Sequence, residues 1–133
     1  MNIRSLLTAT ALIEAATGIA LLIAPSLVVE LLLGEGLSAP QSLVLGRIAG
    51  AALISIGVAC WLARKSERNE AQRGLITGLS FYNVAVPTLL LYAAIALEMR
   101  GIFIWPGGIL HAALAIWCLE FLRPRQHGRE VIK

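Results

Sequence analysis

Four long stretches of the chain are almost wholly apolar, and short polar or turn-rich segments separate them. The apolar stretches cover residues 5–24, 41–64, 71–99 and 104–122. About 20 residues in a helix extend roughly 30 Å, which is the thickness of the hydrocarbon layer of a bilayer. The pattern therefore predicts four membrane-spanning helices.

A shorter apolar segment follows the first predicted helix. Pro25 ends or bends that helix, and residues 26–33 form the sequence SLVVELLL. This segment is too short to cross a bilayer and carries Glu30, so we expect a helix lying at the membrane interface. Pro87 should kink the third long helix. Residues 1–133 are thus expected to form a single transmembrane domain, an all-α, up-down four-helix bundle with a short interfacial helix after the first span.

Composition supports a membrane protein and excludes several other classes. The 133 residues are 58% hydrophobic and only 14% charged, with a mean hydropathy of +0.80, whereas soluble domains carry about 25% charged residues. No polar stretch is long enough for a soluble catalytic domain. The first apolar run is longer than the core of a signal peptide and holds Glu14 at its middle, so we interpret it as a retained helix.

The basic residues are distributed unevenly between the two ends of the predicted helices. Nine of the 11 lysines and arginines fall on one side of a four-helix model, Arg100 falls on the other, and Arg47 lies within a span. The nine are Arg4, Arg64, Lys65, Arg68, Arg73, Arg123, Arg125, Arg129 and Lys133. The positive-inside rule then places both termini in the cytoplasm of a bacterium, with the chain in the inner membrane. Basic residues arranged in this way are not a nucleic-acid signal.

Each predicted span contains one strongly polar residue: Glu14, Arg47, Asn83 or His111. Polar and ionisable groups in spans usually face the interior of the bundle and mark function. Position along each helix puts Glu14 and Asn83 near the midplane, and Arg47 and His111 in the outer third. We therefore expect a Glu14–Arg47 pair flanked by Asn83 and His111, in a polar pocket that opens outward.

Each of these four residues also has a purely structural interpretation. Arg47 could extend to the outer surface as an anchor, and Glu14 could be protonated and bonded to a backbone carbonyl. Asn83 could join two helices through a hydrogen bond, and His111 could be a structural histidine. Tyr82 could face either lipid or a ligand.

Glycines recur along one face of the second long helix, at Gly46, Gly50 and Gly57. Small residues four apart allow membrane helices to approach closely, so these glycines are expected to pack against another helix or a partner protein. Cys60 and Cys118 lie near the cytoplasmic face and are interpreted as small buried side chains. They do not form a metal site with His111, and the chain has no phosphate-binding loop, nucleophile elbow, HExxH or CxxC motif. No catalytic residue and no metal ligand is therefore assigned.

Four segments carry a resemblance to a known group of proteins: IEAATGIALLIAPSLVVELLLG, LGRIAGAALISIGVACWLAR, FYNVAVPTLLLY and WPGGILHAALAIWC. They resemble small bacterial four-helix inner-membrane proteins of the DoxX-like group, over most of residues 10–120. Some DoxX-type proteins are subunits of quinone-linked oxidoreductases, so the resemblance implies an accessory-subunit or quinone-facing role. The segment after Pro25 and the lack of a redox motif depart from that group.

The leading functional hypothesis is a non-enzymatic membrane protein that binds a small or amphipathic ligand, of the lipid or quinone type, in the polar pocket. Arg47 would hold an anionic or carbonyl oxygen, Glu14 would set the charge balance, and Asn83 and His111 would orient the ligand. One alternative is an accessory subunit of a membrane complex, for example a quinone-linked one, packed through the glycine face. Another is a homo-oligomeric, proton-coupled transporter or channel with Glu14 and His111 as relay groups.

Overall fold

The computed structural model describes residues 2–66 and 69–123, which form five helices and no strand. The helices are α1 (Ile3–Ile23), α2 (Pro25–Leu33), α3 (Pro40–Ala63), α4 (Glu70–Ala96) and α5 (Ile104–Leu122). The all-helical prediction is confirmed for these residues, and the ends of the helices lie within three residues of the expected positions. The four long helices are each long and apolar enough to cross a membrane.

Local sequence explains where the helices begin and end. Asn2 and Asn69 cap α1 and α4 by accepting hydrogen bonds from the backbone amides of Arg4 and Gln72. Asn is a favoured residue at that position because its side-chain oxygen satisfies an amide that has no partner in the helix. Pro25 and Pro40 begin α2 and α3, where the missing N–H of proline costs nothing.

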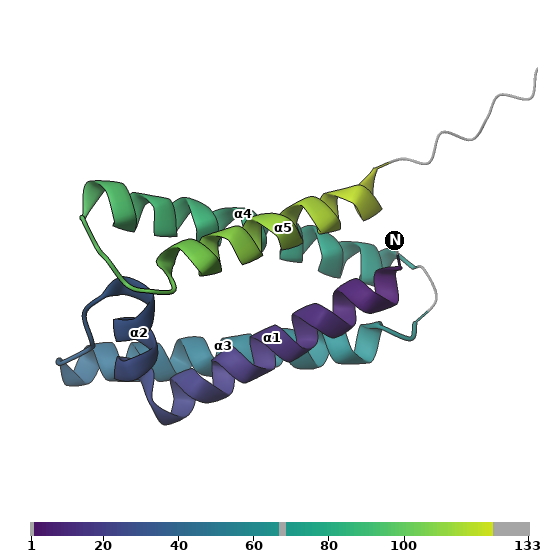
Figure 1. The fold of residues 1–133 in the computed structure, drawn as a ribbon. Helices are drawn as coiled ribbons and strands as arrows, with labels where there is room; N and C mark the ends of the chain where they lie inside the picture. The colour runs from purple at the N-terminus through teal and green to yellow at the C-terminus, as the bar shows by residue number, and fades with distance from the viewer. Residues whose placement is uncertain (1, 67–68, 124–133) are drawn as a thin grey trace, which may run out of the picture.

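The long helices are arranged as two antiparallel pairs (Figure 1). Helix α1 packs along α3, and α4 packs along α5. Helix α2 lies between the pairs at one end, together with the connection from α4 to α5. The start of α1, the end of α3, the start of α4 and the end of α5 lie at the opposite end (Figure 1). The polypeptide therefore runs alternately up and down through its long helices.

Close contact between α1 and α3 depends on glycines. A Cβ atom added to Gly50 would lie 2.7 Å from the Gly18 carbonyl oxygen, and one added to Gly18 would lie 2.6 Å from that of Gly50. A Cβ on Gly57 would lie 3.0 Å from the Ala11 carbonyl oxygen, and one on Gly46 would lie 2.9 Å from Pro25 Cβ. The glycine face of α3 is thus packed against α1 and the start of α2.

The buried apolar residues form two separate clusters. The larger one joins α1, α3, α4 and α5 near the end where α1 begins, and contains Leu6, Leu7, Ala11, Cys60, Ile76, Leu79, Leu114 and Cys118. The smaller one lies near α2, and contains Leu90, Ala93 and Ile104 with Leu32 and Leu33 packed against them. Between the clusters lie polar side chains from α1, α4 and α5.

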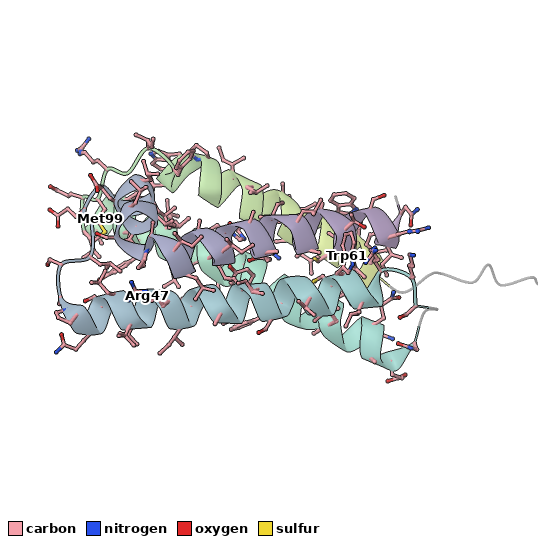
Figure 2. The ribbon with its side chains drawn as sticks, turned by 90° about the horizontal axis from the view of Figure 1, so that it is seen from below. Arg47, Trp61 and Met99 are labelled. Carbon is pink, nitrogen blue, oxygen red and sulfur yellow. The ribbon has the colours of Figure 1, made fainter. Side chains whose placement is uncertain are left out.

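Large apolar side chains also cover the outside of the helices. Phe81 is 79% exposed, Ile23 76% and Leu62 70%. At the end where α1 begins, the described residues include a group of basic side chains: Arg4, Arg64, Lys65, Arg73 and Arg123. The Arg64 guanidinium lies 3.2 Å from the centre of the Trp61 ring, and Trp61 is at this end in Figure 2. Membrane-spanning helices typically show this distribution of residues, with an apolar exterior and with aromatic and basic side chains at one end.

Candidate ligand site between the helix pairs

A cluster of four polar residues, Glu14, Tyr82, Asn83 and His111, lies between the two apolar clusters. Glu14 comes from α1, Tyr82 and Asn83 from α4, and His111 from α5. Glu14 is 1% exposed and Asn83 is fully buried, while Tyr82 and His111 are partly exposed. Successive residues of a helix point about 100° apart, which allows Tyr82 to contact α1 while Asn83 contacts α5.

Short contacts connect these side chains in one chain of interactions. The Tyr82 hydroxyl donates to Glu14 Oε2 at 3.4 Å. The rings of Tyr82 and His111 meet edge to face, with their centres 5.4 Å apart. His111 Nδ1 lies 2.8 Å from Asn83 Oδ1, and Asn83 Nδ2 donates to the Leu79 carbonyl at 2.8 Å. Helices α1, α4 and α5 are thereby joined through polar contacts at one level.

The contacts of Asn83 determine which His111 nitrogen carries the proton in the neutral ring. Asn83 Nδ2 is engaged with Leu79, so the atom facing His111 is the amide oxygen, which can only accept a hydrogen bond. Nδ1 of His111 must therefore be the N–H donor, and Nε2 carries the lone pair. Nε2 makes no hydrogen bond within the described part of the chain. It remains a free acceptor at a partly exposed residue.

Two polar oxygens on α1 are buried without a hydrogen-bond partner among the described residues. They are Glu14 Oε1 and Thr10 Oγ1. Thr10 and Glu14 are four residues apart, so they occupy the same face of α1. Nearly all buried polar groups in proteins have a partner, and an exception in a native structure calls for an explanation, such as a bound water or ligand.

An apolar groove between α4 and α5 leads toward this cluster. Its α4 wall is Pro87, Leu90, Leu91 and Ala94, and its α5 wall is Ile104, Trp105, Gly108, Ile109 and Ala112. Pro87 is one turn beyond Asn83, and Ala112 adjoins His111. The inner end of the groove is therefore about one helical turn from Asn83 along α4, and neither Asn83 nor His111 lines it. Pro87 has no N–H, so it cannot donate to the Asn83 carbonyl as another residue in the helix would.

The structure does not bring Arg47 to this cluster, and the expected Glu14–Arg47 pair is not formed. Arg47 is exposed, and its Nε donates to the Leu22 carbonyl at 3.3 Å. Leu22 is eight residues beyond Glu14, or about 12 Å along α1. Figure 2 shows Arg47 toward the same end of the molecule as Met99. The only ion pair among the described residues is Arg123–Glu120, at 3.2 Å.

His111 lies deeper than its position along α5 indicated. It is at the level of Asn83, which is 13 residues, or about 20 Å, from the end of α4. The reason is the connection from α4 to α5, which folds inward against α2. The Phe103 amide donates to the Leu31 carbonyl at 3.0 Å, and Gly101 packs on the backbone of Leu32. Helix α5 therefore begins closer to the middle of the molecule than the point at which α4 ends.

Three residues that matter in the structure, Tyr82, Thr10 and Gly18, had little to mark them in the sequence. Tyr82 had two open interpretations, and nothing marked Thr10 or Gly18 before their neighbours were known. The spacing of four between Thr10 and Glu14 was the available signal for Thr10. Cys60 and Cys118 are both buried free cysteines, in keeping with their interpretation as small buried side chains. No group of histidine, cysteine and acidic residues that could hold a metal ion occurs in residues 2–66 and 69–123.

Comparison of the chain with protein-family models, curated proteins and solved structures gives no match. A functional interpretation therefore has to come from the residues of the chain itself.

Proposed function

We propose that the chain is a multi-pass protein of the bacterial inner membrane that binds a small or amphipathic ligand between its helix pairs. In this proposal the four long helices form an up-down bundle across the bilayer, with both termini in the cytoplasm. The ligand is of the lipid or quinone type, and it is bound rather than chemically converted. The observation that carries the proposal is Glu14, a carboxyl group 1% exposed with one oxygen lacking a partner.

Placement in a membrane is supported by the surface of the helices. Phe81, Ile23 and Leu62 are mostly exposed, and removing such side chains from water contributes about 1.5–3 kcal/mol each. Lipid is the solvent in which a surface of this kind is stable. The orientation is supported by the basic residues at the end where α1 begins, because cytoplasmic ends of membrane helices are enriched in lysine and arginine.

The ligand site is supported by the cost of burying polar groups. A buried polar group without a partner costs about 1–3 kcal/mol, and this cluster has two such oxygens, Glu14 Oε1 and Thr10 Oγ1. The neighbouring Tyr82 and His111 are partly exposed, so a ligand can reach the cluster from the lipid. A ligand hydrogen-bonded to these oxygens would offset the cost of leaving them buried without a partner.

A second candidate role is subunit of a larger membrane assembly, and one observation favours it. Gly74 and Gly78 are four residues apart on α4, and a Cβ atom on either would meet nothing within 4 Å. Small residues at this spacing let a helix of another chain approach closely. Gly74 and Gly78 are therefore the candidate contact with a partner helix, in place of the glycine face of α3, which α1 already covers.

Native mass spectrometry of the protein in mild detergent tests the ligand proposal. We expect the wild type to retain an added mass that Glu14→Leu and His111→Leu each lose. Ser55→Ala is the matched control, because Ser55 is exposed and bonds only to the Ala51 carbonyl of its own helix. Wild type without any retained mass, or variants that retain it as the wild type does, would overturn the proposal.

A further inference from the structure

Three donors of the cluster are engaged with neighbouring groups, and the second ring nitrogen of His111 is left as an acceptor. The Tyr82 hydroxyl donates to Glu14, the Asn83 amide to Leu79, and His111 Nδ1 to Asn83. His111 Nε2 and Glu14 Oε1 remain without donors among the described residues. The unpartnered Thr10 hydroxyl is fully buried, whereas His111 is partly exposed. A molecule that reaches His111 Nε2 therefore pairs with it through an N–H or O–H group.

The charge of the cluster also restricts the ligand. The cation expected from the sequence, Arg47, is turned away to the Leu22 carbonyl, and Glu14 is the one acidic residue of the cluster. An anionic head group at His111 Nε2 would meet an acceptor and the nearby Glu14 carboxyl group, without a cation of the cluster to compensate. The cluster thus disfavours carboxylates and phosphates and favours neutral groups that donate hydrogen bonds.

The groove between α4 and α5 determines what is attached to that head group. Its walls are apolar along their whole length, from Trp105 at the outer end to Pro87 and Ala112 at the inner end. Its inner end is one helical turn from Asn83 along α4 and next to His111 in α5. A hydrocarbon chain lying in this groove would direct its polar end toward His111.

We infer that the ligand is a neutral amphiphile whose hydroxyl-bearing head donates to His111 Nε2 and whose single hydrocarbon chain lies in the α4–α5 groove. This inference rests on the proposed function and specifies the chemical class of its ligand. Long-chain alcohols, monoacylglycerols and quinols share this chemistry. Ionised fatty acids and fully oxidised quinones do not, because they lack a hydrogen-bond donor.

Trp105 provides a probe at the mouth of the groove, and the other two tryptophans can be removed. In a Trp61→Phe, Trp117→Phe protein, fluorescence comes from Trp105 alone. Three amphiphiles with the same brominated chain, which quenches tryptophan on contact, then differ only in the head: a monoacylglycerol, a methyl ester and a fatty acid. The ester is neutral but cannot donate, which separates the effect of charge from that of the donor. An unbrominated quinol and an unbrominated long-chain alcohol are added in separate experiments as competitors of the brominated monoacylglycerol. The more effective competitor tells whether the natural ligand resembles a quinol or an aliphatic alcohol.

The expected result is saturable quenching by the monoacylglycerol at about tenfold lower concentration than by the ester or the acid, the difference that one hydrogen bond makes. Ala112→Phe should abolish it by filling the groove, whereas Ala113→Phe, an exposed neighbour outside the groove, should leave it unchanged. Equal binding of the three amphiphiles, or tighter binding of the acid, would overturn the donor-head inference and leave a ligand site in place. Absence of saturable quenching by all three would overturn both the inference and the proposed function.

Discussion

His111 Nδ1 and Asn83 Oδ1 lie 2.8 Å apart, and this contact joins α5 to α4 in the interior of the protein. It fixes the tautomer of the histidine and with it the acceptor that His111 presents at its other nitrogen. Its energy should therefore be measurable, and so should its effect on the chemistry of the site.

A double-mutant cycle on Asn83 and His111 should show that the two side chains interact. We expect Asn83→Ala and His111→Ala each to lower the free energy of unfolding, and the pair to lower it by about 0.6–2 kcal/mol less than the sum, which is the range for a hydrogen bond between membrane helices. Reversible unfolding in mixed micelles measures these values. Strictly additive effects would show that the contact contributes no energy.

The approach of α1 to α3 should tolerate no side chain at Gly50. Gly50→Ala places a Cβ atom 2.7 Å from the Gly18 carbonyl oxygen, so we expect a loss of about 1–3 kcal/mol from overpacking. Gly78→Ala is the matched control because nothing lies within 4 Å of the added atom, and it should be neutral or slightly stabilising. Equal stability of the two variants, measured in the same unfolding assay, would refute close packing at Gly50.

Arg47 should be separable from Glu14. Because its Nε donates to the Leu22 carbonyl and its side chain is exposed, Arg47→Met should lower stability by no more than about 1 kcal/mol. A thermal-melt cycle of Glu14→Gln with Arg47→Met should be additive. A coupling of about 3–5 kcal/mol, as expected for a buried ion pair, would show that the two residues meet after all.

The orientation in the membrane can be tested with single cysteines. In a protein whose natural Cys60 and Cys118 are replaced, a cysteine at Ser38 should react with an impermeant reagent added to intact cells, and one at Ser66 should not. Both positions are exposed and lie at opposite ends of α3. Labelling at both positions after the cells are opened is the control. Reaction at Ser66 in intact cells would reverse the proposed topology.

Helix positions followed from the sequence because long apolar runs and prolines are local signals. Pro25 and Pro40 begin helices, and each long helix ends within three residues of the expected position. The side chains that meet could not be predicted in the same way. Position along a helix gives depth only if its start is known, and the inward fold at Gly101 displaced α5 and carried His111 to the level of Asn83.

Rotation about the helix axis was the second unknown. Gly50 was expected to lie at a close contact, but its counterpart Gly18 became evident only from the packing of α1 on α3. Arg47 was expected to point toward Glu14, yet it is close to Leu22, two turns further along α1. Each of these helices carries hydrophobic side chains on all of its faces. The spacing of apolar residues in the sequence therefore does not indicate which face points to the interior.

The protonation of the two imidazole nitrogens of His111 gives the most direct test of a ligand site whose free acceptor is Nε2. With ¹⁵N-labelled histidine, NMR spectra of the protein in micelles distinguish the protonated from the unprotonated nitrogen, and a His127→Gln background leaves His111 as the one histidine observed. We expect a protonated Nδ1 and an unprotonated Nε2, and an Nε2 signal that shifts when a monoacylglycerol is added but not when the methyl ester of the same chain is added. A proton on Nε2 in the free protein, or an Nε2 signal that the monoacylglycerol leaves unchanged, would contradict the site.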